Sequence, residues 1–351
     1  MIEPKPFIKG IRPYPMPEPG RGKKIRLDMN ENTRGCSPKV LDAIKRLDPE
    51  DIATYPEYGE LKRKLAKHHS VDPENIILTN GADDGFRSVM TTYLKPEDEI
   101  IIPVPNYPMF EILARQNGTT ITDVLYNDDL NFPTEMVLGA ITKRTKMVVI
   151  VNPGNPTGSV IPEEDLIRIL DRKKDTVVLL DETYYQFADK SFIPLIKDYP
   201  NLIIIQTFSK VFGLAGLRIG FIITTKKNIE DLSKVNLPFP VSCVGIAAAS
   251  AALDDLYHIN EYVREVMIGR NFLYRKLREM NFDVRMTRSN FILLNLKGDN
   301  GRIREELKRR NILVKDLDHY PLLKGFIRIT IGTHSENLVL LEALKDILNY
   351  D

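Results

Sequence analysis

A lysine that follows a predicted buried strand is the residue of this sequence best suited to chemistry. The apolar run at 202–205 indicates the strand, and Ser209 and Lys210 come soon after it. The glycines that follow allow close approach of backbone to a ligand, and Arg218 lies eight residues after the lysine. Hydroxyls, close backbone and a guanidinium suit a bound phosphate, and the neighbouring amine suits a Schiff base with a phosphorylated aldehyde cofactor. Taken alone, Lys210 is better explained as a surface lysine.

Two more polar residues follow predicted buried strands. The β-branched run at 147–151 precedes Asn152, and the run at 176–180 precedes Asp181. A carboxylate at the end of a buried strand needs a cationic partner, and a protonated pyridine nitrogen is one; the alternative is that Asp181 caps the next turn. Because ligands of parallel α/β sheets bind where strands end, we expect Asn152, Asp181 and Lys210 to lie close together.

A fourth strand end carries a glycine turn. The strand predicted at 76–79 is followed by Gly81, Ala82 and Asp83 and by a helix that runs to about Tyr93. The free amides and positive dipole end of a helix N-terminus bind anions, which predicts a phosphate site here. Acidic residues at 83 and 84 equally suit a helix start without a ligand.

These motifs require a sheet that collects strand ends at one edge. Strands alternate with helices from about 76 to 225, which predicts an α/β fold: a large domain with a mainly parallel wound sheet, and a smaller α+β domain. We expect the large domain at 30–243 and the small domain at 1–29 plus 244–351. Residues 1–29 are expected to form an irregular, proline-rich lead that packs on the small domain.

Composition excludes several classes of function. The 351 residues include 49 basic and 48 acidic side chains, so no net field favours nucleic acid or an anionic membrane. No apolar run approaches the ~20 residues of a membrane span, and the first residues lack a signal-peptide core. Two distant cysteines and five scattered histidines form no metal-ligand pattern. We therefore expect a cytoplasmic protein with no metal, no nucleic-acid partner and no membrane partner.

The motif around the lysine resembles that of a known family. Ser-Lys-Val-Phe-Gly-Leu-Ala-Gly-Leu-Arg at 209–218 resembles the cofactor-lysine motif of fold type I pyridoxal-phosphate aminotransferases, the aspartate aminotransferase superfamily. It is most similar to the histidinol-phosphate aminotransferase branch. Asn-Pro-Gly-Asn-Pro-Thr-Gly at 152–158 and Asp-Glu-Thr-Tyr at 181–184 also fit family motifs. The resemblance covers nearly the whole chain.

The resemblance implies pyridoxal 5'-phosphate as cofactor and assigns a role to each candidate residue. Lys210 would hold the cofactor, Asp181 would face the ring nitrogen, and Asn152 and Tyr184 would donate to the phenolic oxygen. Tyr107 would stack on the ring, although an ordinary buried tyrosine is about as good an explanation. The phosphate would be held by Gly81, Ala82, Asp83, Ser209, Arg218 and, from the partner subunit of a homodimer, by the residue equivalent to Tyr55.

The same resemblance implies a substrate site. Arg328 would grip the substrate carboxylate bidentately, rather than form a strand-edge salt bridge. Tyr14 and Asn30 would lie near the substrate. Lys315 stands where histidinol-phosphate aminotransferases usually have an arginine for the substrate's phosphate; a lysine keeps the charge but not the planar fork.

The expected activity is transfer of an amino group between an amino acid or histidinol phosphate and a 2-oxo acid, expected to be 2-oxoglutarate, as in histidine biosynthesis. Three alternatives stay open from the sequence. The first is an aromatic or aspartate-type aminotransferase, and the second is a lyase similar to threonine-phosphate decarboxylase. The third is a cofactor-binding regulatory module without catalysis.

Overall fold

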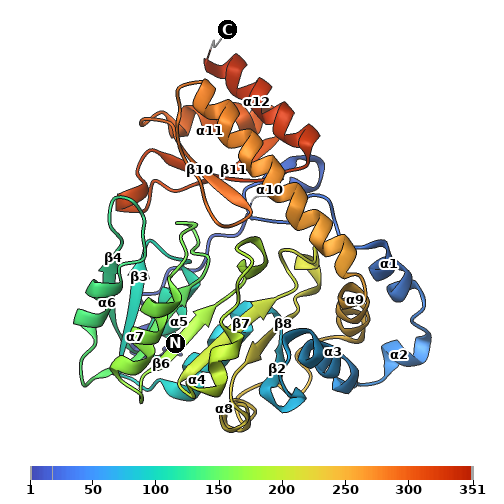
Figure 1. The fold of residues 1–351 in the computed structure, drawn as a ribbon, viewed down its shortest axis with the longest axis vertical. Coiled ribbons are helices and arrows are strands. Elements are labelled where there is room, and N and C mark those ends of the chain that lie inside the picture. The colour runs from blue at the N-terminus through green and yellow to red at the C-terminus, as the bar shows by residue number, and fades with distance from the viewer. Residues whose placement is uncertain (1, 18, 349–351) are drawn as a thin grey trace.

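The larger sheet is built from strands that are apolar on both faces. The computed structural model describes residues 2–17 and 19–348, and Figure 1 shows this sheet below a smaller one. Its strands, in spatial order, are β2 (Ile76–Thr79), β8 (Gly220–Ile223), β7 (Leu202–Thr207), β6 (Val177–Asp181), β5 (Thr145–Val151), β3 (Glu99–Val104) and β4 (Thr120–Leu125). Strand β8 runs opposite to the other six, so its pairings with β2 and β7 are antiparallel and the remaining pairings are parallel. The predicted α/β fold with a mainly parallel sheet is therefore confirmed.

Helices cover both faces of this sheet because its side chains alternate. Val148 and Ile150 of β5 belong to the core on one face, and Val149 belongs to the core on the other. The first face is covered by α3 (Gly59–His69), α6 (Thr134–Ala140) and α7 (Glu163–Arg172), and the second by α4 (Gly81–Tyr93), α5 (Met109–Gln116) and α8 (Lys226–Leu232). Within the described ranges, no helix is long and apolar enough to cross a bilayer.

The second sheet has five strands and lies at the other end of the molecule (Figure 1). Its order is β1 (Ile25–Leu27), β11 (Ile312–Asp316), β12 (Phe326–Thr330), β10 (Phe291–Asn295) and β9 (Asp283–Arg285). The helices of this part are α10 (Leu256–Glu279), α11 (Asn300–Arg309) and α12 (His334–Leu348), and α9 (Cys243–Leu253) precedes them. Helix α9 ends at Leu253 and α10 begins at Leu256, so Asp254 and Asp255 separate the two helices.

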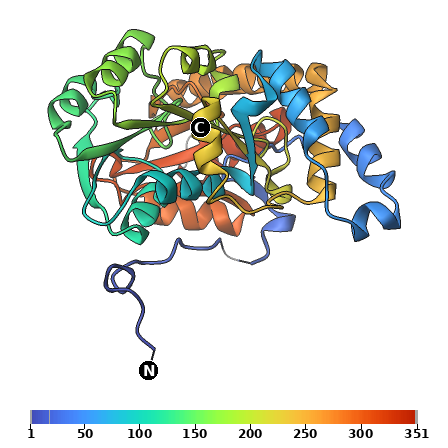
Figure 2. The same ribbon diagram turned by 90° about the horizontal axis from the view of Figure 1, so that it is seen from below.

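The N-terminal lead differs from expectation. The prediction of an irregular lead is wrong for Ile25–Leu27, which form β1 and pair in parallel with β11. Three residues carry too little pattern to indicate a strand, and the partner lies almost at the other end of the chain. Nearer the N-terminus, Phe7 packs against Gly118, beyond the end of α5, so the lead also contacts the layer around the larger sheet. Figure 2 shows the lead running outside the body of the molecule.

Two short helices join the lead to the larger sheet. Helix α1 (Pro38–Lys45) is capped by Ser37, whose hydroxyl accepts from the Lys39 amide at 3.1 Å, and α2 is Pro49–Ala53. The remaining one-turn 3-10 helices are Pro6–Ile8, Arg21–Lys23, Pro73–Asn75, Tyr185–Phe187, Ile193–Lys197, Ala215–Leu217 and Pro321–Leu323.

Candidate active site

Three candidate residues follow neighbouring strands of the larger sheet. Strands β5, β6 and β7 lie side by side, with Val151 opposite Asp181 and Asp181 opposite Ile205. Directly after β5, the Asn152 amide donates to the Asp181 carbonyl at 2.8 Å. The side-chain oxygen of Asn152 accepts from the Ile161 amide at 2.9 Å, which leaves the Asn152 NH₂ group to act as a donor. The structure thus brings Asn152 and Asp181 to the edge beyond which Lys210 lies.

Asp181 is a buried carboxylate without a cationic partner. Its side chain is 4% exposed, and its Oδ1 accepts from the Thr183 amide at 2.9 Å. In the part of the chain that the structure describes, no lysine or arginine forms an ion pair with it. Burial therefore raises the pKa of Asp181 to about 6. A cationic group bound beside this carboxylate would reverse that shift.

Lys210 lies beside Tyr184, and its charge also acts weakly on the Asp181 carboxylate. Its Nζ donates to the Met29 carbonyl at 2.9 Å and is 5.8 Å from the centre of the Tyr184 ring. Burial lowers the pKa of Lys210 to about 8, and the charge of Arg328 acts in the same direction. The amine is therefore easier to deprotonate than an ordinary lysine.

Tyr184 and Asn30 are in direct contact. The Asn30 Nδ2 donates to the Tyr184 hydroxyl at 2.9 Å, and both side chains are buried. Burial raises the pKa of Tyr184 to about 12, so the hydroxyl keeps its proton at neutral pH. Asn30, predicted to lie near the substrate, is thus hydrogen-bonded to Tyr184, a candidate cofactor contact.

An anion cradle lies at the N-terminus of α4. Gly81 has φ +74°, and a Cβ built on it would come within 2.5 Å of the Arg218 Nη2, so the guanidinium lies directly against this turn. The backbone amides of Gly81, Ala82 and Asp83 have no acceptor among the residues described. The Asp83 carboxylate pairs with Arg218 at 3.3 Å. Free amides, a helix dipole and an arginine together favour a phosphate.

Ser209 is oriented by its own turn. Its hydroxyl oxygen lies 2.9 Å from the Thr207 hydroxyl oxygen, and its amide donates to the same Thr207 oxygen at 3.0 Å. The Thr207 hydroxyl also donates to the Ile219 carbonyl at 3.1 Å, so its single proton is shared between two acceptors. These contacts hold the Ser209 hydroxyl just beyond the end of β7, next to Lys210.

Two tyrosines from distant segments meet beside the cradle. The rings of Tyr14 and Tyr107 lie edge to face, with centroids 6.0 Å apart. Burial and the neighbouring Asp83 carboxylate raise the pKa of Tyr107. Burial also raises the pKa of Tyr14, which faces the charge of Arg328. The structure therefore brings Tyr14, predicted from the lead, to the candidate site.

Arg328 is buried and forms no ion pair with a carboxylate of the described residues. Its guanidinium donates to the Asn155 side-chain oxygen and to the Asp28 carbonyl, the latter at 2.7 Å, while its Nε is buried without an acceptor. The Asp28 carboxylate itself is paired with Arg21 at 2.7 Å. Burial lowers the pKa of Arg328, which marks an uncompensated cation.

Lys315 lies directly opposite Arg328. The two residues are register partners on the antiparallel strands β11 and β12, so their side chains emerge on the same face. No ion pair of Lys315 is found within residues 2–17 and 19–348. Burial and the charge of Arg328 lower the pKa of Lys315. Two neighbouring cations without an acidic partner form a site for an anion.

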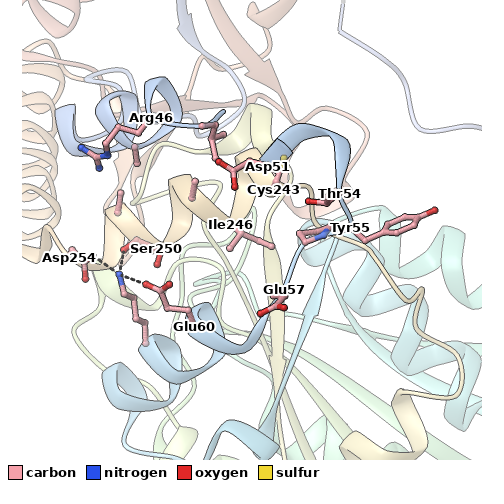
Figure 3. Close-up of a pocket in the computed structure, with 16 residues that line it drawn as sticks. Arg46, Asp51, Thr54, Tyr55, Glu57, Glu60, Cys243, Ile246, Ser250 and Asp254 are labelled. Carbon is pink, nitrogen blue, oxygen red and sulfur yellow. Dashed lines mark hydrogen bonds and ion pairs between the residues drawn. The ribbon is translucent and has the colours of Figure 1, made fainter. Parts of the chain in front are cut away.

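Tyr55 is the candidate that the structure does not bring into the site of its own chain. Its ring is 80% exposed and stacks on Phe239, with centroids 4.3 Å apart. Figure 3 shows this ring pointing outward from the rim of a groove of about 740 Å³ between α1, α2, α3 and α9.

Several residues of the site were not predicted. Asn155 lies inside a predicted motif, yet its contact with Arg328 spans 173 positions of the chain. Thr330 follows Arg328 by two residues and faces the same side of β12, which was the available signal. Glu182 is fully buried and accepts from the Phe192 amide and the Gln206 side chain, at 2.6 and 2.8 Å.

Comparisons with known proteins find aminotransferases that match nearly the whole chain. The family described as aminotransferase class I and II matches residues 22–344. Histidinol-phosphate aminotransferase of Methanococcoides burtonii is 34% identical over 328 residues, which cover 92% of this chain and 90% of that protein. Histidinol-phosphate aminotransferase 1 of Archaeoglobus fulgidus is 33% identical over 325 residues, or 92% and 99% of the two chains. The Sinorhizobium meliloti histidinol-phosphate aminotransferase, solved in complex with pyridoxal-5'-phosphate, superposes with a TM-score of 0.87 at 28% identity, covering 98% of this chain and 97% of that one.

Proposed function

Because the chain belongs to the class I and II aminotransferase family, we propose that it moves an amino group from histidinol phosphate to a 2-oxo acid, with 2-oxoglutarate as acceptor. The family resemblance drawn from residues 209–218 is confirmed. The cofactor is pyridoxal 5'-phosphate. A role in histidine biosynthesis and a cytoplasmic location belong to the same proposal. The proposed large domain is 30–243, and the proposed small domain is 1–29 plus 244–351.

The residues of the site fit this cofactor. Asp181, buried and without a cation, suits a protonated pyridine nitrogen. The α4 amides, Ser209 and Arg218 suit the phosphate, and a side chain at Gly81 would fill that cradle. Lys210, with a lowered pKa, suits covalent attachment of an aldehyde. This agreement of three independent features supports the assignment of the cofactor.

The bound cofactor supplies an electron sink for the bond that breaks at the substrate Cα. Lys210 takes the proton from this Cα through its Nζ, and its pKa of about 8 leaves a useful fraction neutral. Asp181 would hold the proton on the ring nitrogen. Asn152 and Tyr184 would donate hydrogen bonds to the phenolic oxygen, and Tyr107 would pack on the ring.

The proposal of a phosphorylated donor rests on the pair Lys315 and Arg328. A carboxylate brings one negative charge, whereas a phosphate monoester brings close to two at neutral pH. Two adjacent cations with no acidic partner among the described residues match a phosphate better. Arg328, predicted to grip a substrate carboxylate, is therefore proposed to share the phosphate of this donor with Lys315, because histidinol phosphate has no carboxylate. Tyr14 is proposed to border this substrate site, since it faces the charge of Arg328.

The exposure of Tyr55 supports a homodimer. Tyr55 lines the groove of Figure 3 and stacks on Phe239, and both rings are about half exposed or more. Exposed aromatic side chains of this kind are typical of a protein interface. In the proposed dimer, Tyr55 reaches the cofactor phosphate of the partner subunit, which explains why it contacts no other candidate residue of its own chain.

A panel of amino donors tests the proposal. Purified enzyme loaded with pyridoxal phosphate is mixed with histidinol phosphate, histidinol, aspartate, phenylalanine or threonine phosphate, and conversion of the aldehyde cofactor to its amine form is followed by absorbance. Histidinol phosphate should convert it fastest, and 2-oxoglutarate should reverse the change. Release of carbon dioxide from threonine phosphate would identify a lyase instead. Lys210→Ala should lose both the visible absorbance and turnover, and retained turnover would refute the assignment.

A further inference from the structure

Asn30 lies between Tyr184 and Thr330 in a buried hydrogen-bonded chain. All three side chains are at most 3% exposed. The Asn30 Nδ2 donates to the Tyr184 hydroxyl at 2.9 Å, and the Thr330 hydroxyl donates to the Asn30 Oδ1 at 3.1 Å. The Asn30 backbone amide donates to the Thr330 oxygen at 3.0 Å. The three residues come from three segments of the chain and form one continuous chain of donors and acceptors.

The direction of this chain is decided by Thr330. Its oxygen accepts from the Asn30 amide, so its proton must be donated elsewhere, and the only acceptor found in the described residues is the Asn30 Oδ1. With Oδ1 on that side, the Asn30 NH₂ group must face Tyr184. The reversed amide would leave the buried Thr330 proton without an acceptor, which is costly.

Asn30 itself is held firmly in place. Its backbone has φ +54°, a conformation that asparagine tolerates better than most residues. The Asn290 side chain donates to the Asn30 carbonyl at 3.1 Å, and Thr330 holds the Asn30 amide. The backbone amide and carbonyl of Asn30 are therefore both anchored to buried side chains, one in β12 and one directly before β10. An aspartate at this position would accept from Tyr184 and reverse the polarity.

The consequence falls on the Tyr184 proton. Since the Tyr184 oxygen accepts from Asn30, its own proton is not used in any hydrogen bond within residues 2–17 and 19–348, and it can be donated to a ligand. We propose that Thr330 and Asn30 are positioning residues that turn the Tyr184 proton toward the phenolic oxygen of the bound cofactor. This inference rests on the proposed function, and it replaces the predicted substrate contact of Asn30.

The charged groups around Tyr184 stay constant in the test. They are Arg328, Asp181 and Asp83. Lys210, at 5.8 Å from the ring centre, carries the cofactor in the loaded enzyme and is unchanged in every variant. The substitutions Asn30→Ala and Thr330→Val change no charge. A lost donor leaves the negative phenolic oxygen less stabilised, so the protonated form of the bound cofactor persists to higher pH. The midpoint of its visible pH titration should rise by roughly one unit.

The experiment measures this midpoint for the enzyme loaded with pyridoxal phosphate. Asn30→Ala and Thr330→Val are each made in the native chain and in a Tyr184→Phe background. We expect both to raise the midpoint in the native chain and to add nothing in the Tyr184→Phe background. The matched control is Thr224→Val, because Thr224 is equally buried and donates to the Leu202 carbonyl, at the start rather than the end of β7. This control should leave the midpoint unchanged.

Each other outcome overturns the inference. An unchanged midpoint in both variants, or an equal shift in the Tyr184→Phe background, excludes the positioning role. A raised KM for the amino donor with an unchanged midpoint would indicate that Asn30 contacts the substrate instead. If Asn30→Ala does not fold, the nearly isosteric Thr330→Val decides the question alone. Failure of the native enzyme to show any visible absorbance with pyridoxal phosphate would instead refute the proposed function.

Discussion

The Arg218 guanidinium lies directly against the α-carbon of Gly81: a Cβ at position 81 would come within 2.5 Å of Nη2. These residues belong to different strand ends and meet because β2 and β8 are neighbours in the sheet. Gly81 also has φ +74°, a conformation that costs a residue with a side chain about 1 kcal/mol or more. The turn therefore requires glycine for two separate reasons, and both serve the proposed phosphate cradle.

Gly81→Ala should weaken the binding of pyridoxal phosphate by about tenfold or more, because it displaces Arg218 from the cradle. The dissociation constant can be measured by titrating the cofactor-free protein and following absorbance. Gly139→Ala is the control, since a Cβ there meets nothing within 4 Å and Gly139 lies in α6, outside the site. Equal affinities in the native and Gly81→Ala proteins would show that Arg218 does not hold the phosphate.

Asp181→Asn should stabilise the cofactor-free protein while it abolishes turnover. The pKa of Asp181 is raised from 3.8 to about 6 in the folded state, so the folded protein binds more protons than the unfolded protein between these values. The folded protein is therefore destabilised as pH rises from about 4 to about 6, because the buried carboxyl must then ionise. Removing the charge should therefore raise the free energy of unfolding at pH 7 by on the order of 2–3 kcal/mol, with little gain below pH 4. Denaturant unfolding at pH 4 and pH 7 measures this difference. Asp198→Asn, on an exposed aspartate, should show no such gain, and a destabilised Asp181→Asn protein at pH 7 would contradict the argument.

Lys315→Met should raise the KM for histidinol phosphate by about tenfold or more and change little for donors without a phosphate, because it removes one of two adjacent cations. Lys324→Met, on an exposed lysine of the neighbouring segment, is the control. The pKa of Lys315 is lowered, so its charge disappears at a lower pH than that of an ordinary lysine, and the KM of the native enzyme should rise in alkaline solution. In Lys315→Arg the KM should stay flat to higher pH. A KM that changes equally for phosphorylated and unphosphorylated donors would place Lys315 outside the phosphate site.

Mixing two inactive variants should restore activity if Tyr55 acts across a dimer. A Lys210→Ala chain keeps an intact Tyr55, and a Tyr55→Ala chain keeps an intact Lys210. After random reassociation, about a quarter of all sites combine an intact Lys210 with an intact Tyr55 from the partner subunit. Turnover measured before and after mixing should show this recovery. Activity that never exceeds the average of the two separate variants would exclude a shared site, and gel filtration of the native chain as a monomer would exclude the dimer.

Much of the site could be predicted because its signals are local. Asn152, Asp181 and Lys210 each follow an apolar run that only a buried strand explains, and parallel strands present their carboxyl ends at one edge. The glycine turn at Gly81 before α4 carries its own signal in the same way. The pairing of Ile25–Leu27 with β11 had no such signal, since three residues do not define a period and the partner strand lies at the far end of the chain.

The sequence by itself determined the alternation of strands and helices, the residues that follow the strands and, through its motifs, the family. Tertiary structure alone decided that Asn30, Tyr184 and Thr330 meet, since 300 positions separate Asn30 from Thr330 and 154 separate Asn30 from Tyr184. It also set Lys315 opposite Arg328 and left Tyr55 exposed. The physical reason is that burial and turn formation act between near neighbours along the chain, whereas the choice of a hydrogen-bond partner depends on how two separately formed sheets pack together.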